Sequence, residues 1–384
     1  MLSGVREIEI RQGGLARDPS LRAASGWRVL VETGSVSIWS VPELRVRRDD
    51  LASCELVEGE SLREDLDEGE AQLLVERFAL SANNVSYAAL GERLGYWRLF
   101  PAPEGWGRIP AWGYARVVGS RSAALAEGER MFGLVPMGSY LTVCPAPHPV
   151  GFMDAAPHRA GLSPVYNQYL SLEDEGDDAA LVMRPLFGTS VLLDLVLSER
   201  GRAGARTVVL TSASSKTAYG LAHLLRGRQL ETIGLTSGTR RAWVEGLGLY
   251  DEVLAYDEVG NLSASKGAVL VDFAGDRALV RRLHEQLGDA LERSILVGFT
   301  HRQLEADEAP LPGPVPEFFF APDEMVRRGR ELARLYAVAW QEFAPVVERT
   351  MRIERVTDGD QLVRVYRELL DGRVDPAVGH VVTL

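Results

Sequence analysis

The stretch from Thr211 to Thr217 carries the clearest chemical potential in this chain of 384 residues. It reads Thr-Ser-Ala-Ser-Ser-Lys-Thr and lies between an apolar, β-branched run at 207–210 and a helical pattern at 217–225. A helix N-terminus that follows a buried strand offers unpaired N–H groups and a positive dipole end to an anion. The residues expected to bind a phosphate there are Ser212, Ser214, Ser215, Lys216 and Thr217.

The glycines that usually let such a loop approach a phosphate are missing. Serine and alanine lose easy access to positive φ, but serine hydroxyls can donate to phosphate oxygens and Lys216 adds a positive charge. That lysine stands out, because the 42 Lys and Arg residues include only two lysines. The alternative is that Ser215 is an ordinary helix N-cap. A Walker-type triphosphate loop is excluded, since both of its glycines are absent.

A second polar cluster, Thr-Ser-Gly-Thr-Arg-Arg at 236–241, follows the next predicted strand. A carboxylate at this position would bind the ribose hydroxyls of NAD, but the cluster has no acid. Its hydroxyls and two guanidinium groups suit a further phosphate, because an arginine fork bonds two oxygens at once. The pattern therefore favours NADPH over NADH, unless the arginines only mark the start of a helix. The residues expected to contribute are Thr236, Ser237, Arg240 and Arg241.

The elements that position these clusters alternate regularly after residue 206. Strands are predicted at 207–210, 231–235, 252–255, 268–273 and 294–299, with helices at 217–225, 240–247 and 277–287. Such alternation predicts a doubly wound α/β domain with a parallel sheet. The chain before about residue 150 is different, with short strands and frequent glycine turns that predict a barrel-like β domain. Further helices are predicted at 186–199, 323–343 and 358–370, and further strands at 351–356 and 379–384.

The order of these segments resembles the medium-chain dehydrogenase/reductase superfamily, especially its zinc-free quinone-reductase and enoyl-reductase-like branch. The likeness covers nearly the whole chain, although its motifs are degenerate. It rests on VERFALSANNVSYAAL at 75–90, IPAWGYARVVG at 109–119 and EGERMFGL at 127–134. Where many members carry Gly-His-Glu, this chain has Trp112-Gly113-Tyr114. The loop Ser-Ala-Ser-Ser-Lys-Thr-Ala is similar to that of an uncharacterised side branch.

This resemblance implies a Rossmann doubly wound parallel sheet inserted into a β-rich, GroES-like barrel domain. The β-rich substrate domain would comprise residues 1–185 and 346–384, and the Rossmann domain residues 186–345. Phe299 and Thr300 would lie where the last strands of the family reach the nicotinamide. The family also implies a homodimer, joined edge to edge through the Rossmann sheets.

The residues for acid–base chemistry are less clearly marked. A hydride acceptor that becomes an enolate or phenolate needs a donor near its oxygen and a source of protons. Tyr87 and Tyr114 could supply the proton and Asn84 a hydrogen bond, with Tyr96 and Tyr140 as further tyrosines of the same domain. Each of them also has a structural explanation. No metal is expected, because a catalytic zinc needs about three convergent ligands and the chain has two cysteines and six scattered histidines.

The bulk properties limit the partners. A net charge of −12 argues against a broad nucleic-acid surface, and the absence of a long apolar run or signal-like start predicts a cytoplasmic protein without a membrane segment. The main hypothesis is a zinc-independent NADPH-dependent oxidoreductase that transfers hydride to an activated C=C bond, a quinone or a related carbonyl compound. One alternative is a protein that binds NADP(H) or another ligand without catalysis. The other is a reductive step on an acyl thioester in a biosynthetic pathway.

Overall fold

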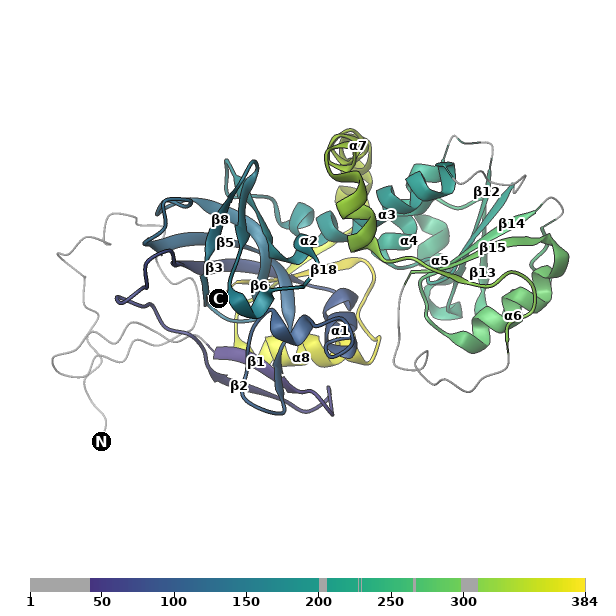
Figure 1. Cartoon of the computed structure of the whole chain (residues 1–384). Helices are drawn as coiled ribbons and strands as arrows, with labels where there is room; N and C mark the ends of the chain where they lie inside the picture. Colours follow the sequence, from purple (N-terminus) through teal and green to yellow (C-terminus); the bar gives the residue numbers. More distant parts are fainter. Residues whose placement is uncertain are drawn as a thin grey trace. The chain divides into compact units, whose positions relative to one another are not determined.

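The computed structural model of the chain describes residues 42–199, 206–226, 228, 230–264, 267–297 and 310–383. One of its two large sheets is six-stranded and entirely parallel (Figure 1). Side by side lie β13 (Glu252–Ala255), β12 (Glu231–Thr236), β11 (Thr207–Leu210), β14 (Ala268–Asp272), β15 (Leu291–Leu296) and β16 (Glu317–Phe318). Counted along the chain, their spatial order is 3-2-1-4-5-6, the Rossmann order. The predicted doubly wound α/β sheet is confirmed.

Short helices follow three of these parallel strands. They are α4 (Lys216–Leu225), α5 (Arg241–Gly246) and α6 (Arg277–Leu287). Two begin with a side-chain cap: Ser215 Oγ accepts from Ala218 N, and Asp276 accepts from the N–H groups of Ala278 and Leu279. The strand order reverses between β11 and β14, so the carboxyl ends of these two strands form the place where such sheets bind ligands.

The second large sheet is nine-stranded and β-rich (Figure 1). Its main path runs β17 (Arg352–Val356), β18 (Val378–Thr383), β3 (Ala71–Leu80), β5 (Pro110–Ser120), β6 (Arg130–Pro136), β10 (Gln168–Leu172), β9 (Gly151–Asp154) and β8 (Pro145–His148), with β7 (Tyr140–Val143) paired to β3. A smaller sheet contains β2 (Cys54–Glu58), β1 (Pro42–Arg47) and β4 (Trp106–Arg108). Because β18 pairs antiparallel with β3, the end of the chain returns to the β-rich part, as the resemblance implied.

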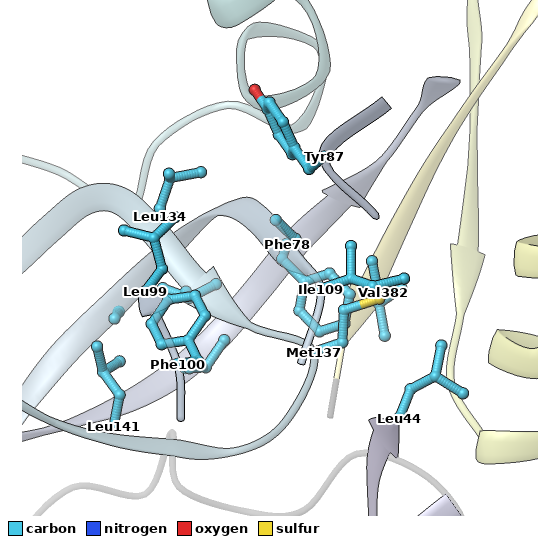
Figure 2. Close-up of a cluster of buried hydrophobic side chains, with 14 of the residues drawn as sticks. Leu44, Phe78, Tyr87, Leu99, Phe100, Ile109, Leu134, Met137, Leu141 and Val382 are labelled. Atoms are coloured by element: carbon cyan, nitrogen blue, oxygen red, sulfur yellow. The ribbon is translucent and has the colours of Figure 1, made fainter. Parts of the chain in front are cut away.

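One large hydrophobic cluster fills most of the β-rich part and includes side chains from both ends of the described chain. In Figure 2, Val382 of β18 lies beside Phe78 of β3 and Ile109. Trp97 packs so closely on Gly91 that a Cβ at this glycine would lie 2.1 Å from the indole. The core therefore requires glycine at this position.

Two long helices, α3 (Asp178–Glu199) and α7 (Ala321–Thr350), pack against each other and share an aromatic core. The rings of Phe187 and Phe343 stack with centroids 4.3 Å apart. By length and composition α3 could cross a membrane, but 72% of its apolar window is buried inside the molecule. Its hydrophobicity is therefore that of a core helix.

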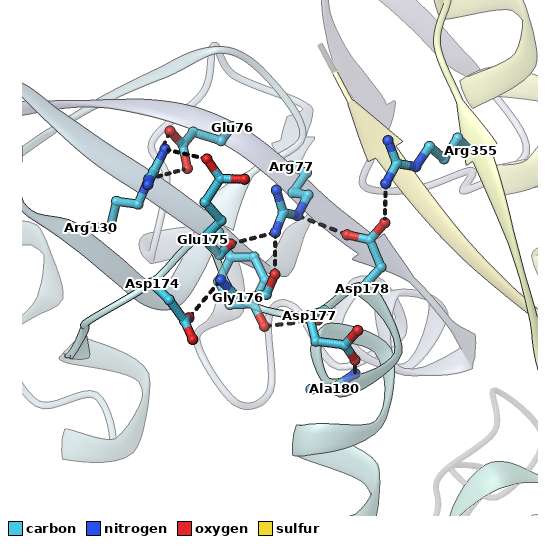
Figure 3. A network of polar contacts seen from close by, with 11 residues as sticks. Glu76, Arg77, Arg130, Asp174, Glu175, Gly176, Asp177, Asp178, Ala180 and Arg355 are labelled. Carbon is cyan, nitrogen blue, oxygen red and sulfur yellow. Dashed lines mark hydrogen bonds and ion pairs between the residues drawn. The ribbon is translucent and has the colours of Figure 1, made fainter. Parts of the chain in front are cut away.

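Helix α3 begins eight residues earlier than the sequence pattern predicted. Pro185 lies inside it and interrupts the helical pattern, because proline lacks the N–H of a helix interior. The first turns are nevertheless fixed by polar contacts: Asp177 Oδ1 accepts from Ala180 N, and Asp178 pairs with Arg77 and Arg355 at 2.8 Å each (Figure 3). These ion pairs anchor the helix start to β3 and β17.

Candidate functional site

A cleft of about 610 Å³ opens at the carboxyl ends of β11 and β14, where a Rossmann sheet binds its ligand. Two groups of residues line it. The polar group consists of Ser212, Ser214, Ser215, Lys216, Thr217 and Arg240, with residues 372, 374–376 and 378. The aromatic group includes Tyr87, Tyr96, Trp112, Tyr166 and Phe320. The cleft thus combines the predicted phosphate loop with an apolar wall.

In the loop after β11, a serine takes the positive φ that glycine usually provides. Ser212 has φ +48° and is the only residue other than glycine with positive φ in the described ranges, and its N–H donates to Tyr256 Oη at 3.2 Å. Ser215 caps α4, so the N-cap interpretation holds for its side chain. No acceptor is found among the described residues for the N–H groups of Ser214, Lys216 and Thr217. Three donors therefore remain for an anion, as expected at a helix N-terminus.

Lys216 points toward the last strand of the chain. Its Nζ donates to the carbonyl oxygens of Pro376, at 3.1 Å, and Val378, at 2.7 Å. Burial lowers the pKa of Lys216 to about 8, although the nearby Asp375 carboxylate acts in the opposite direction. An ammonium group has three protons, so one remains for a ligand in the cleft.

The two arginines of the second cluster have different surroundings. Arg240 lines the cleft, donates to Ser214 Oγ at 3.5 Å and to the carbonyls of Gly372 and Val374 at 2.9 and 3.0 Å. Arg241 pairs instead with Glu245 and Glu258 and does not line the cleft. The two guanidinium groups are thus not equivalent.

The remaining predicted cofactor residues lie elsewhere. Thr236 is buried, the Ser237 hydroxyl contacts that of Thr239, and neither residue lines the cleft. Phe299 and Thr300 lie outside the described residues.

The aromatic wall is built by α1 (Ala82–Ala89), the turn at Tyr96–Arg98, strand β5 and the short helix α2 (Pro164–Asn167). Trp112 Nε1 donates to Tyr87 Oη at 2.9 Å. The rings of Tyr87 and Tyr96 lie 4.9 Å apart, and the hydroxyls of Tyr96 and Tyr166 are 2.7 Å apart. Burial raises the pKa of Tyr87 to about 12, so its phenol stays neutral over the physiological range.

Of the three predicted catalytic residues, only Tyr87 lines this cleft. Asn84 is buried, accepts from Ser81 N at 2.7 Å and donates to Pro110 O at 2.9 Å, as a helix-capping residue. Tyr114 is a buried residue of β5 that does not line the cleft, and it donates to Asp177 O at 3.1 Å. Both side chains have structural partners instead of access to a ligand.

Two parts of the wall escaped the sequence interpretation. Tyr166 follows a Ser-Pro helix start in a stretch without clear periodicity, and Phe320 precedes α7 at the end of a proline-rich passage. Both residues lie outside the stretch at 96–114 in which aromatic residues are concentrated. No group of three or more metal-ligating side chains occurs in the part of the chain that the structure describes.

Comparisons with known proteins identify a family and a fold. A model of a family described as "Protein of unknown function (DUF2855)" matches residues 78–375, and no curated protein sequence matches the chain. Among solved structures, CurA from Vibrio vulnificus has 14% identity and a TM-score of 0.60, covering 89% of this chain and 98% of that one.

Two further solved structures are similar. A putative NADPH:quinone reductase from Mesorhizobium loti has 14% identity and a TM-score of 0.59, covering 86% of this chain and 91% of its own. The yhdH oxidoreductase from Salmonella enterica in complex with NADP has 14% identity and a TM-score of 0.53, with coverages of 90% and 100%. These likenesses confirm the fold of the medium-chain dehydrogenase/reductase enoyl and quinone reductases.

Proposed function

The chain belongs to the family described as a protein of unknown function (DUF2855), and we propose that it is an NADPH-dependent, zinc-independent reductase. Its substrate would be a small molecule with an activated C=C bond, a quinone or a related carbonyl compound. The observation that carries this proposal is the single cleft in which a Rossmann phosphate loop meets an aromatic wall.

The polar group of the cleft fits a dinucleotide. The unpaired N–H groups of Ser214, Lys216 and Thr217 would bind the pyrophosphate. Arg240 would approach the additional phosphate of NADPH, since its Nε–H has no acceptor among the described residues. No acidic side chain follows β12 in the turn at 236–241, which favours NADPH over NADH. Two similar solved proteins contain NADP and NADPH.

When bound, the reduced nicotinamide would supply hydride. The chain itself would orient a flat substrate against Tyr87, Trp112 and Phe320. The charged side chains among the described residues lining the cleft are Lys216, Arg240 and Asp375, all in the polar group. The aromatic wall therefore suits an uncharged reacting group.

We further propose a cytoplasmic homodimer. Strand β16 is one of the two outer strands of the parallel sheet, with β13 at the opposite edge, and an outer strand offers N–H and C=O groups to a second copy. The division into a substrate domain of residues 1–185 and 346–384 and a Rossmann domain of residues 186–345 is part of the same proposal.

One observation favours a protein that binds NADP(H) or another ligand without catalysis as the second candidate. Both Lys216 and Arg240 already donate to backbone carbonyls of residues 372–378, so these cations also have a structural role. A reductive step on an acyl thioester uses the same cleft and stays a variant of the main proposal.

The test is a titration of the full chain with NADPH and with NADH, in which binding is monitored by protein fluorescence and by thermal denaturation. Saturable binding with a preference for NADPH is expected, and oxidation of NADPH should then be measured with quinones, enones and enoyl thioesters. No response to either cofactor at millimolar concentration would exclude the proposal. Binding without turnover across all three substrate classes would favour the second candidate.

A further inference from the structure

The hydroxyl groups of Tyr96 and Tyr166 form a pair in the wall of the cleft, 2.7 Å apart. The two residues come from segments separated by 70 positions in the chain. Their side chains are 97% and 94% buried, yet both border the cleft. A buried polar pair at the edge of a cavity is placed to meet a ligand.

One of the two phenolic O–H groups of this pair has no acceptor in the shared hydrogen bond. Each phenol has one proton, and the shared hydrogen bond uses one of the two. No other hydrogen-bond partner of either hydroxyl is found within the described ranges. A buried donor without an acceptor costs free energy, so an oxygen atom of a ligand in the cleft would satisfy it.

The surroundings keep both groups neutral and favour one of them as the donor to a ligand. Burial raises the pKa of both phenols well above the ordinary value, so both keep their protons at physiological pH. The Asp323 carboxylate also acts on Tyr166 and would repel negative charge near that hydroxyl. An anionic oxygen is therefore better placed at Tyr96, with Tyr166 donating to Tyr96.

We propose that Tyr96, oriented by Tyr166, is the hydrogen-bond donor to the carbonyl oxygen of the substrate. This inference rests on the proposed reductase function. Hydride from NADPH forms a C–H bond at the distal carbon of the C=C bond, the C=C electron pair moves between the next two carbons, and the carbonyl π pair moves to oxygen. The cofactor loses two electrons, the substrate gains them as an enolate, and a proton from water completes the product at the neighbouring carbon.

In this step Tyr96 keeps its proton and stabilises the charge that develops on oxygen. Such a donor acts more strongly in a site from which water is excluded. Tyr166 is a positioning residue, because its own hydrogen bond polarises and orients the Tyr96 hydroxyl. The Tyr87 hydroxyl accepts from Trp112 Nε1 and keeps its own proton, so it is a second donor in the same wall.

The test measures binding of para-nitrophenol to the full chain. The phenolate form of this probe resembles the enolate and has its own visible absorbance. The wild type should bind the phenolate more tightly than the phenol. Tyr96→Phe should weaken phenolate binding by about 10-fold or more, the usual loss of a hydrogen bond to a charged group, and Tyr166→Phe by roughly twofold. Binding of para-nitroanisole, which cannot ionise, should change little in either variant.

Tyr140→Phe is the matched control. Tyr140 lies on β7, does not line the cleft, and its hydroxyl has no hydrogen-bond partner among the residues described. This variant should bind the phenolate as the wild type does. In turnover, Tyr96→Phe should lower kcat by about 100-fold with little change in KM.

Phenolate binding that is equal in wild type and Tyr96→Phe, or a wild type without preference for the phenolate, would overturn the inference. Tyrosine-to-phenylalanine changes keep the ring packing, and thermal denaturation would detect a loss of folding. Failure of the reductase proposal is distinguished separately, because it would appear as absence of NADPH binding in the wild type. The phenolate measurement does not require NADPH.

Discussion

Replacing Lys216 by methionine should remove one component of the pH dependence of stability. The substitution keeps an unbranched stem and deletes the ammonium group that contacts Pro376 and Val378. Burial lowers the pKa of Lys216 from its ordinary value of 10.5 to about 8 in the folded chain. Between these two values, the unfolded chain holds a proton that the folded chain has released.

The sign follows from this difference in bound protons. Since the unfolded state binds more protons between about pH 8 and 10.5, stability from this group rises with pH across that interval. A tenfold change in proton affinity corresponds to about 1.4 kcal/mol, so the full gain would be roughly 3 kcal/mol. Below pH 8 both states are protonated, and the group contributes no slope.

The assay is urea denaturation of wild type and Lys216→Met at several pH values between about 7 and 10. The difference in free energy of unfolding, wild type minus variant, should increase with pH by about 1.4 kcal/mol per pH unit above pH 8. Buried tyrosines such as Tyr87, whose pKa is raised to about 12, lower stability as the pH passes 10 in both proteins, so the difference cancels them. A difference that stays constant from pH 7 to 10 would refute the proposed burial of the lysine charge.

Two further substitutions have matched controls. Arg240→Met should weaken NADPH binding by about 10-fold and NADH binding much less, because only NADPH carries the extra phosphate. The control Arg241→Met loses its ion pairs with Glu245 and Glu258 but should leave both affinities unchanged. Equal effects of the two variants in fluorescence titrations would contradict the assignment of Arg240 to the phosphate. Gly91→Ala should lower the free energy of unfolding by about 1–3 kcal/mol, because its Cβ would overlap the Trp97 indole. Gly246→Ala, with open space around the added carbon, should be neutral or slightly stabilising by comparison; similar losses in both would show that the Trp97 contact is not decisive.

The parallel sheet was predictable because its strands are local and strongly patterned. The four consecutive apolar or β-branched residues of β11 are all buried, and a capped helix follows them. This local pattern was enough to predict both the strand and the position of the loop after it. The return of β18 to β3 came from resemblance, since pairing between residues 80 and 380 leaves no trace in local periodicity. The domain boundaries at 185 and 345 stay a prediction, and α3 and α7 extend across both positions.

The candidate site was predictable in part for the same reason. The loop residues from Ser212 to Thr217 are contiguous and follow a strand, so their shared position in one cleft was expected. Asn84 and Tyr114 were selected by residue type, which cannot distinguish a side chain facing a cleft from one bonded to Pro110 or Asp177 inside the fold. The Tyr96–Tyr166 pair depends on two segments meeting in space, and that information is tertiary.

The missing glycines of the phosphate loop have a physical explanation in this fold. Ser212 takes the positive φ at which glycine is usual, and its N–H is held by Tyr256, so a local contact offsets the strain. Lys216 and Arg240 meanwhile bind carbonyls of residues 372–378, which places backbone from the end of the chain beside the loop. The two cations therefore have two functions that use different protons, because the third Lys216 proton and the Arg240 Nε–H remain for a phosphate. Amide hydrogen exchange in residues 372–378 should slow on addition of NADPH, whereas faster exchange there would mean that the phosphate takes the cations away from the backbone.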